Sequence, residues 1–338
     1  MKFRYDALPM RVVFGAGALA DLPAEIARIG LERVLVLCGP RQKAVGKQVA
    51  DALGARCVGI LPEATMHVPI EVARRAREVA AELGADGCVA VGGGSAIGLG
   101  KAVALEHGLP VVAVPTTYAG SEMTPVWGLT ENGVKRTGRD RKVLPVSVVY
   151  DPELTLSMPV GLAVTSGINA MAHAAEGLYA PDGSPIVALM AREGIRALTA
   201  ALPAIVADPE DADARADALY GAWLCGAVLG ATTMGLHHKL CHALGGTLNL
   251  PHSETHTVVL PHVLAYNDAH EPDGLWELEG RLGAPRSLRE LGMAEGDIDR
   301  IAEQVASATF ANPRPVTRGG VRDLLRAAWA GTQPEHRF

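Results

Sequence analysis

The stretch Cys88-Val89-Ala90-Val91-Gly92-Gly93-Gly94-Ser95 decides the fold class of this chain. It begins as a short apolar run typical of a buried strand and passes through three glycines into a helical stretch that carries Lys101. Glycines at such a turn let the backbone approach a pyrophosphate closely, and the following helix presents free N–H groups and a positive dipole end. The turn therefore predicts a phosphate site, although packing of a strand on a helix also favours glycine.

The first half of the chain repeats this alternation of strand and helix. Short β-branched runs alternate with amphipathic helical stretches, which is typical of βαβ units around a parallel sheet. The predicted strands are residues 33–38, 57–61, 88–91, 111–114 and 146–150. The predicted helices between them are residues 45–53, 70–83 and 96–106. This half is therefore predicted to be an α/β, Rossmann-like domain.

The second half changes character after Asp151-Pro152-Glu153-Leu154, where strand-like runs largely give way to long Ala- and Leu-rich segments. We expect the domain boundary at Met158-Pro159, which gives a nucleotide-binding domain over residues 1–158 and an all-helical catalytic domain over residues 159–338. Residues 219–236 form an uncharged run just long enough to span a membrane. Its four glycines and two threonines favour a buried central helix instead.

Composition excludes several classes of protein. The hydrophobic fraction is 49% with only 4% aromatic residues, and 38 glycines are present, which favours close helix packing over an all-β fold. A net charge of -6 gives no electrostatic footprint for nucleic acid or an anionic membrane. The five cysteines contain no CxxC pair, and no apolar segment of a signal peptide is evident near the N-terminus. We therefore expect a reduced, cytoplasmic protein.

Histidines cluster in the second half. His238 and His242 are four residues apart, so on a helix they share one face, and His237 lies beside them. His173 and His252 lie elsewhere in this half. Together, His173, His238 and His252 could bind a divalent transition metal if an anionic fourth ligand were added. Asn169 stands four residues before His173 and offers only a neutral oxygen. Hydrogen-bonded core histidines are the alternative interpretation.

Motifs along nearly the whole chain resemble the iron-containing (group III) alcohol dehydrogenase family. They are Gly92-Gly93-Gly94-Ser95, Pro115-Thr116-Thr117, Asp151-Pro152-Glu153-Leu154, Gly235-xx-His238-xxx-His242-xx-Gly245 and Pro251-His252. Other stretches are most similar to the maleylacetate reductase branch of that family. These are Met66-His67-Val68-Pro69-Ile70-Glu71, the helix from Gly94 to Lys101, Thr137-Gly138-Arg139-Asp140 and Gly235-Leu236-His237-His238-Lys239-Leu240-Cys241-His242.

The resemblance implies a nicotinamide cofactor, NADH or NADPH, bound by the Rossmann-like domain, with the active site in a cleft between the two domains. The expected cofactor-binding residues are Gly92, Gly93, Gly94, Ser95, Thr116, Thr117, Gly39 and Pro40. The expected catalytic residues are His242, His238, His173, His252, Asn169, Tyr118 and Lys142. The residues themselves leave open whether Thr116 and Ser121 bind a ligand or only cap helices.

At two positions this sequence differs from the branch of the family that binds a metal. Asn169 replaces a liganding aspartate, and Gly98 replaces an aspartate in the helix after the glycine turn. The three metal-ligand histidines of the family do carry over, onto His173, His238 and His252, and His242 matches a histidine beside the substrate. We therefore expect no metal, although these three histidines would be its ligands if one were bound.

The implied reaction is reduction of maleylacetate (4-oxohex-2-enedioate) to 3-oxoadipate in the degradation of aromatic compounds. Its substrate is a small dicarboxylate, and a basic stretch is available to receive one carboxylate unless it is simply a solvated loop. The stretch comprises Lys135, Arg136, Arg139, Arg141 and Lys142. A metal-dependent alcohol or glycerol dehydrogenase, a dehydroquinate synthase-like lyase and a non-catalytic nucleotide-binding protein remain as alternatives.

The sequence does not separate NADH from NADPH. No acidic residue follows Gly39 to reject a 2'-phosphate, and Arg41 lies close enough to tolerate one. We expect a homodimer, in which the strand-like residues Val12 to Phe14 offer a segment that could pair between two subunits.

Overall fold

The computed structural model describes residues 3, 5, 7–8, 10–131 and 134–334, with the side chains of Val134 and Lys135 excepted. Contacts divide the chain into two compact units, and the main division falls between Met158 and Pro159. This is the position at which the sequence changes from alternating strands and helices to helices alone. The sheet unit begins at Ala7, and the described residues before it, Phe3 and Tyr5, group with the helical unit. The two units are described separately below.

The first unit is built on a parallel sheet. Among the described residues, six strands pair in the order β1-β8-β5-β4-β2-β3. The strands are β1 (Arg11–Phe14), β2 (Val34–Cys38), β3 (Cys57–Leu61), β4 (Gly87–Gly92), β5 (Val111–Pro115) and β8 (Ser147–Tyr150). All of their neighbouring pairs are parallel. The predicted strands are therefore confirmed to within a residue or two at each end.

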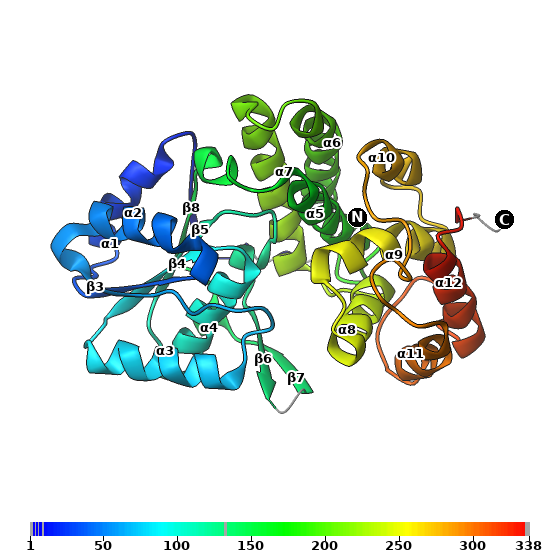
Figure 1. Cartoon of the computed structure of the whole chain (residues 1–338), viewed down its shortest axis with the longest axis horizontal. Coiled ribbons are helices and arrows are strands. Elements are labelled where there is room, and N and C mark those ends of the chain that lie inside the picture. The colour runs from blue at the N-terminus through cyan, green and yellow to red at the C-terminus, as the bar shows by residue number, and fades with distance from the viewer. Residues whose placement is uncertain (1–2, 4, 6, 9, 132–133, 335–338) are drawn as a thin grey trace. The chain divides into compact units, whose positions relative to one another are not determined.

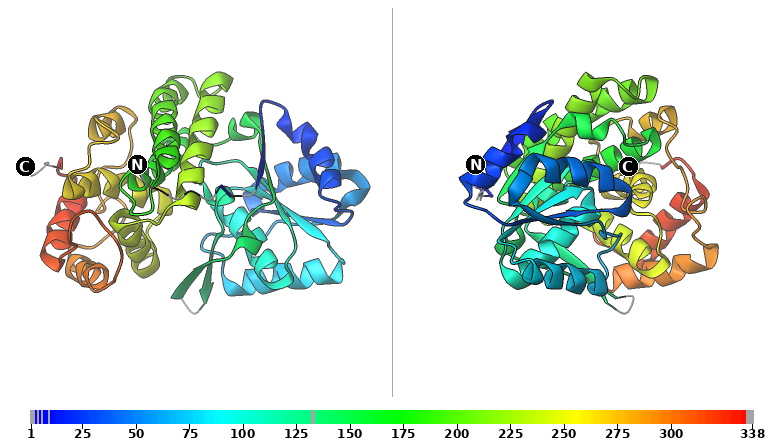
Figure 2. Two further views of the ribbon diagram at one scale, coloured as in Figure 1. Left: turned by 180° about the vertical axis from the view of Figure 1, so that it is seen from behind. Right: turned by 60° about the vertical axis from the view of Figure 1, so that its left-hand side comes forward.

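Helices cover both faces of this sheet, because its central strands are apolar at every position. In β2, Val34, Val36 and Cys38 pack in one core and Leu35 and Leu37 in another. Figure 1 shows α1 (Leu22–Arg28) and α2 (Lys43–Leu53) on one side, and α3 (Ile70–Glu82) and α4 (Gly94–His107) on the other. Figure 2 repeats this layering from behind, with the blue helices above the strands and the cyan helix below. The unit is a doubly wound α/β fold.

The strand order reverses direction beside β2. The chain passes from β2 outward to β3 and then returns to β4 on the opposite side of β2. In open parallel sheets, ligands bind outside the carboxyl ends of the strands at this kind of switch point. The turns that follow β2 and β4, which contain Gly39 and Gly93, are therefore neighbours where a ligand is expected.

The second unit contains the remaining helices. They are α5 (Val160–Leu178), α6 (Pro185–Ala207), α7 (Ala212–Ala231), α8 (Leu236–Leu248), α9 (His252–Asn267), α10 (Leu275–Arg281), α11 (Ile298–Ala306) and α12 (Arg318–Ala330). Helix α5 is buried along almost its whole length between α6, α7 and α9. Helices α8, α9, α11 and α12 enclose a separate apolar core. Polar side chains on α5 are therefore surrounded by protein and need partners or a ligand.

Small residues explain how the long helices approach each other. A Cβ added to Gly194 on α6 would lie 3.0 Å from the backbone oxygen of Gly221 on α7, and one added to Gly221 would lie 2.9 Å from that of Gly194. Two backbones this close leave no room for side chains between them. The abundance of glycine and alanine is thus a requirement of the helical packing.

Two features differ from the sequence predictions. An antiparallel hairpin, β6 (Val126–Glu131) with β7 (Val134–Arg139), was not expected. The apolar run 219–236 is not one helix, because α7 ends at Ala231 and α8 begins at Leu236 after a bend of 96°. The strand-like segment near the N-terminus forms β1, which pairs with β8 at one edge of the sheet, and its pairing between two subunits stays a prediction.

Within the described residues, no single helix is both long and apolar enough to cross a membrane. The bent pair of α7 and α8 passes such a test by length and composition only.

Candidate functional site

The glycine turn is shorter than the sequence suggests. Strand β4 ends at Gly92 and α4 begins at Gly94, so Gly93 alone separates them and Ser95 already lies in the helix. Gly92 has a φ of +140°, a conformation that side chains rarely allow, and a Cβ there would meet the side-chain oxygen of Gln42. The Gly93 carbonyl accepts the N–H groups of Ala96 at 3.0 Å and Ile97 at 3.2 Å, and the N–H groups of Gly94 and Ser95 come before the first acceptor of the helix.

Three turns meet at this edge of the sheet. Gln42 is the last residue of the 3₁₀ turn Pro40–Gln42 after β2, and its Nε2 donates a hydrogen bond to Thr116 Oγ1 at 2.5 Å. The Thr116 N–H donates to the carbonyl of Gly92 at 3.1 Å. A Cβ at Gly93 would lie 2.9 Å from Thr117 Oγ1. The structure therefore brings together the predicted cofactor-binding residues, and Thr116 caps no helix.

Space remains open at the start of α4. A Cβ added to Gly94 would find only the Ala119 Cβ nearby, at 3.7 Å. Free N–H groups, a helix dipole and an unfilled surface are the requirements for binding a phosphate. These residues therefore fit the pyrophosphate of a dinucleotide.

Lys101 anchors the turn that follows β5 from inside the unit. The Lys101 residue is 1% exposed. Its Nζ donates to the Ser121 carbonyl at 2.6 Å, to Thr124 Oγ1 at 2.9 Å and to the Val126 carbonyl at 2.8 Å. Burial lowers the pKa of Lys101 to about 7, and the negative charge of Glu122 opposes that shift. Ser121 therefore accepts bonds from this lysine and does not cap an α-helix.

The histidines gather in the helical unit on three helices. Helix α5 supplies His173, α8 supplies His238 and His242, and α9 supplies His252. The ring centroids of His173 and His238 are 5.1 Å apart, and those of His238 and His242 are 6.1 Å apart. The four-residue spacing on α8 thus places two imidazoles on one face, as predicted.

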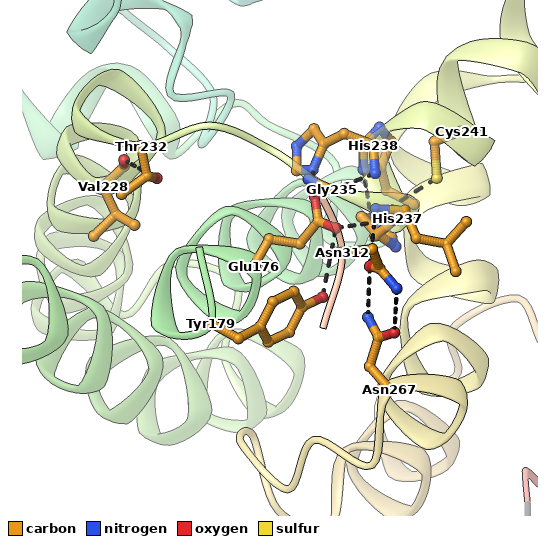
Figure 3. Close-up of polar contacts among 12 residues, drawn as sticks. Glu176, Tyr179, Val228, Thr232, Gly235, His237, His238, Cys241, Asn267 and Asn312 are labelled. Carbon is orange, nitrogen blue, oxygen red and sulfur yellow. Dashed lines mark hydrogen bonds and ion pairs between the residues drawn. The ribbon is translucent and has the colours of Figure 1, made fainter. Parts of the chain in front are cut away.

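A buried carboxylate fixes one of these rings. Glu176 on α5 is fully buried, and its Oε2 lies 2.6 Å from His238 Nδ1 (Figure 3). The same carboxylate accepts the backbone N–H groups at the start of α8, from Gly235 at 3.1 Å, His237 at 2.9 Å and His238 at 3.3 Å. It therefore stabilises the N-terminus of α8 and holds the His238 ring in one tautomer, with the proton on Nδ1.

Several buried polar atoms near this ring have no hydrogen-bond partner among the described residues. They include His238 Nε2, His173 Nδ1 and Asn169 Oδ1. Burial, with the neighbouring imidazoles as a smaller cause, holds the pKa of His173 well below its usual value, so His173 is neutral near pH 7. Buried polar atoms without partners are costly, and these three are therefore candidates to contact a ligand.

Other predicted residues lie elsewhere. His242 is exposed on α8, and Tyr118 is fully buried in the α/β unit. The Lys142 ammonium lies 3.7 Å from a carboxylate oxygen of Asp140, with its side chain about half exposed. The basic stretch is exposed at Arg136, Arg139, Arg141 and Lys142, and the side chain of Lys135 lies outside the described residues.

Comparisons with known proteins agree over both units. Residues 9–152 match the iron-containing alcohol dehydrogenases, and residues 163–275 match the C-terminal part of the Fe-containing alcohol dehydrogenase family. The chain is 57% identical to a maleylacetate reductase of Burkholderia cepacia, over 98% of this chain and 99% of that protein. It is 52% identical to one of Delftia acidovorans, over 99% of this chain and 100% of that protein.

The chain belongs to the iron-containing alcohol dehydrogenase family. Among solved structures, it is similar to a maleylacetate reductase of Agrobacterium tumefaciens, with 50% identity, a TM-score of 0.95 and coverage of 99% and 100% of the two chains. The predicted fold, a parallel-sheet unit followed by a helical unit, is therefore confirmed. Members of this family are NAD(P)-dependent oxidoreductases.

The residues at the metal position depart in two places from the pattern of the metal-binding branch. Asn169 supplies a neutral oxygen, where that branch has an anionic aspartate, beside three imidazoles. Among the described residues, the donor atoms of His173, His238 and His252 do not form a group lying mutually within 4.8 Å. Gly98 stands where the metal-binding branch has a second aspartate. A Cβ on Gly98 would lie 2.8 Å from Val68 Cγ2, so an aspartate at this position would clash with Val68.

Sequence reasoning missed two side chains of this site. Glu176 lies three residues after His173 and seven after Asn169, so all three share one face of α5, and this spacing is visible in the sequence. His256 follows His252 by one helical turn, and their ring centroids are 4.4 Å apart. Only the folded structure places the His256 ring 5.1 Å from that of His238, on a different helix.

Proposed function

We propose that this protein reduces maleylacetate to 3-oxoadipate with NADH or NADPH as the hydride source, and that the reaction needs no metal. The support is the 50–57% identity to maleylacetate reductases over nearly the full length, together with the Glu176–His238 pair and the neutral Asn169. The nicotinamide, when bound, supplies a hydride. We expect both cofactors to be used, since Pro40 and Arg41 stand where an acidic residue would exclude a 2'-phosphate.

The substrate explains why a Lewis acid is dispensable. Its C2–C3 double bond is conjugated with the C4 ketone, so hydride addition at C2 sends the electron pair to the ketone oxygen as an enolate. Protonation of C3 then restores the ketone and completes 3-oxoadipate. A simple aldehyde lacks this conjugation and gains more from a divalent metal on its oxygen. Hydrogen-bond donors are therefore sufficient for the enolate.

We assign these donors to the neighbouring imidazoles, His173 and His242. Glu176 keeps the His238 ring oriented with its unprotonated Nε2 as a hydrogen-bond acceptor. His173 is a neutral donor or acceptor because burial lowers its pKa. His242 is exposed, so it can regain a proton from solvent after each turnover. We therefore assign the proton source to His242.

The Glu176–His238 contact carries this proposal, and one experiment tests it. Oxidation of NADH should be followed with maleylacetate in the presence and absence of a strong chelator. We expect equal rates in both. Stoichiometric iron or zinc, with activity lost to the chelator and restored by the metal, favours the metal-dependent alcohol dehydrogenase instead. NADH bound without net consumption marks a lyase or a binding protein.

Gly94→Val should weaken binding of the nicotinamide cofactor at least tenfold while the fold survives. The added side chain would occupy the open space before α4 and meet little protein, since the nearest atom to a Cβ there is 3.7 Å away. Fluorescence titration with NADH measures the affinity, and Gly161→Val, at an open position on α5, is the matched control. Unchanged affinity in Gly94→Val would remove the phosphate assignment.

His242→Ala should lower kcat about a hundredfold, the loss expected for a positioned proton donor. Cofactor affinity should not change, because the cofactor residues lie in the other unit. Steady-state kinetics with maleylacetate measure both, and Lys239→Ala, at a neighbouring exposed position of α8, is the control. Near-normal turnover in His242→Ala would show that His242 is not the proton source.

We also infer that the protein is a homodimer and that it is cytoplasmic. The cytoplasmic location is supported by the five cysteines, which form no disulfide bond in the structure.

A further inference from the structure

We propose that His237, Cys241 and His256 form a second, buried site for a thiophilic cation of the Zn²⁺ class. The site is separate from the family's metal position at His173, His238 and His252. One donor atom from each of the three residues lies within 4.8 Å of the other two. His237 and His256 are fully buried, and Cys241 is 2% exposed.

Two helices bring these donors together. His237 and Cys241 are four residues apart on α8 and so share one face, and His256 reaches them from α9. His237 Nε2 is the common point, because it lies 2.9 Å from His256 Nδ1 and 3.8 Å from Cys241 Sγ. Without a metal, the two imidazoles share a hydrogen bond at this point.

The spacing is close to that of a tetrahedral centre. Bonds of about 2.0 Å to nitrogen and 2.3 Å to sulfur put neighbouring ligand atoms about 3.3 Å (N to N) and about 3.5 Å (N to S) apart. The observed separations of 2.9 Å and 3.8 Å differ from these by a few tenths of an ångström. The donors of His256 and Cys241 lie within 4.8 Å of each other, so side-chain rotations that bring these two atoms together complete the site.

The chemistry of the donors selects the cation. One thiolate and two imidazoles, without a carboxylate, favour zinc and its analogues cobalt and cadmium over magnesium or calcium. Binding breaks the bond between the two imidazoles. The ring that donates this bond moves its proton from the shared nitrogen to its outward nitrogen, so that both rings coordinate as neutral imidazoles. The Cys241 thiol releases its proton to solvent as the metal–sulfur bond forms. Three protein ligands leave a fourth position for a small exogenous ligand.

The position gives such a cation a direct effect on the first site. The His256 ring packs against His252, with centroids 4.4 Å apart, and against His238, with centroids 5.1 Å apart. A cation that turns His256 therefore also shifts the surroundings of these two imidazoles.

Cobalt titration of the full-length, chelator-treated protein under anaerobic conditions tests the proposal. We expect a thiolate-to-cobalt charge-transfer band in the near ultraviolet, together with visible bands of tetrahedral intensity, both removed by zinc. Cys241→Ser should abolish the charge-transfer band, and His256→Asn should weaken cobalt binding at least tenfold. Cys57→Ser, at a half-buried thiol in the α/β unit, should leave the spectrum unchanged.

Three outcomes would overturn the site. One is a wild-type protein that binds no cobalt or shows no thiolate band at saturation. The second is a band that persists in Cys241→Ser while circular dichroism shows the variant folded. The third is a histidine-only spectrum lost in His173→Ala, which would assign the cation to the family's metal position. None of these measurements depends on turnover, so the proposed function can fail without affecting the result.

Discussion

Glu176→Gln should lower kcat for maleylacetate about a thousandfold. Oε2 of this carboxylate accepts the Nδ1–H of His238, and the carboxylate also accepts three backbone N–H groups at the start of α8. An amide has only one oxygen, so its NH₂ group must face either a backbone N–H or the imidazole. In the second case the His238 proton moves to Nε2 and the ring presents the wrong tautomer, as in the Ser-His-Asp triad when its aspartate becomes asparagine.

Part of the effect of Glu176→Gln will be structural, and the measurements must separate it. Leaving one buried donor unsatisfied costs about 1–3 kcal/mol of stability, which denaturant unfolding detects. The tautomer itself is reported by the low-field proton resonance of the Nδ1–H bond to carboxylate, which should disappear. Cofactor affinity should stay normal. Glu193→Gln, which changes an exposed carboxylate paired with Arg196, is the control. A folded Glu176→Gln enzyme within about threefold of wild-type turnover would contradict the positioning role.

The sheet could be predicted from the sequence because its strands are apolar throughout. Stretches such as Val34–Cys38 and Gly87–Gly92 are buried on both faces and are bounded by glycine or charge, which leaves little ambiguity. The hairpin of β6 and β7 could not be recognised in the same way. Val134–Arg139 has the sequence VKRTGR, which shows no alternation of apolar and polar residues. Figure 1 shows that this hairpin projects from the sheet unit.

The site could be predicted only as far as helical spacing reaches. A separation of four residues places His238 and His242 on one face of α8, but it does not reveal that Glu176 on another helix fixes the first ring. Likewise, the sequence groups His173, His238 and His252 by resemblance to the family. The folded chain brings the donors of His237, Cys241 and His256 closer together. Ring orientation depends on side-chain packing between helices distant in sequence, and no periodicity encodes it.

Asn169→Asp is the prediction that most directly tests the role of the metal. Asn169 is 3% exposed, its Oδ1 has no hydrogen-bond partner among the described residues, and His173 follows it by one turn of α5. The substitution adds the missing anionic ligand at nearly constant volume. After dialysis, we expect the variant to retain close to one equivalent of iron or zinc per chain more than the wild-type protein retains.

The same substitution should lower maleylacetate turnover in metal-free buffer by about two orders of magnitude. A carboxylate about 5 Å from a substrate carboxylate costs about 3 kcal/mol at an effective dielectric constant of about 20, and that energy corresponds to this factor in rate. Metal analysis and steady-state kinetics check the two effects. Asn249→Asp, at the exposed residue that ends α8 with a positive φ, adds the same charge outside the site and should change neither.

The response of the wild-type enzyme to a chelator is the measurement that can contradict the expectation for Asn169→Asp. Because the reaction forms a conjugated enolate that imidazoles can hold, wild-type activity should survive the chelator that strips metal from the variant. If wild-type activity is instead lost to the chelator and returns with iron or zinc, the neutral oxygen of Asn169 is a working ligand. The histidines His173, His238 and His252 would then act through a metal, and the assignment of a metal-free reaction would be wrong.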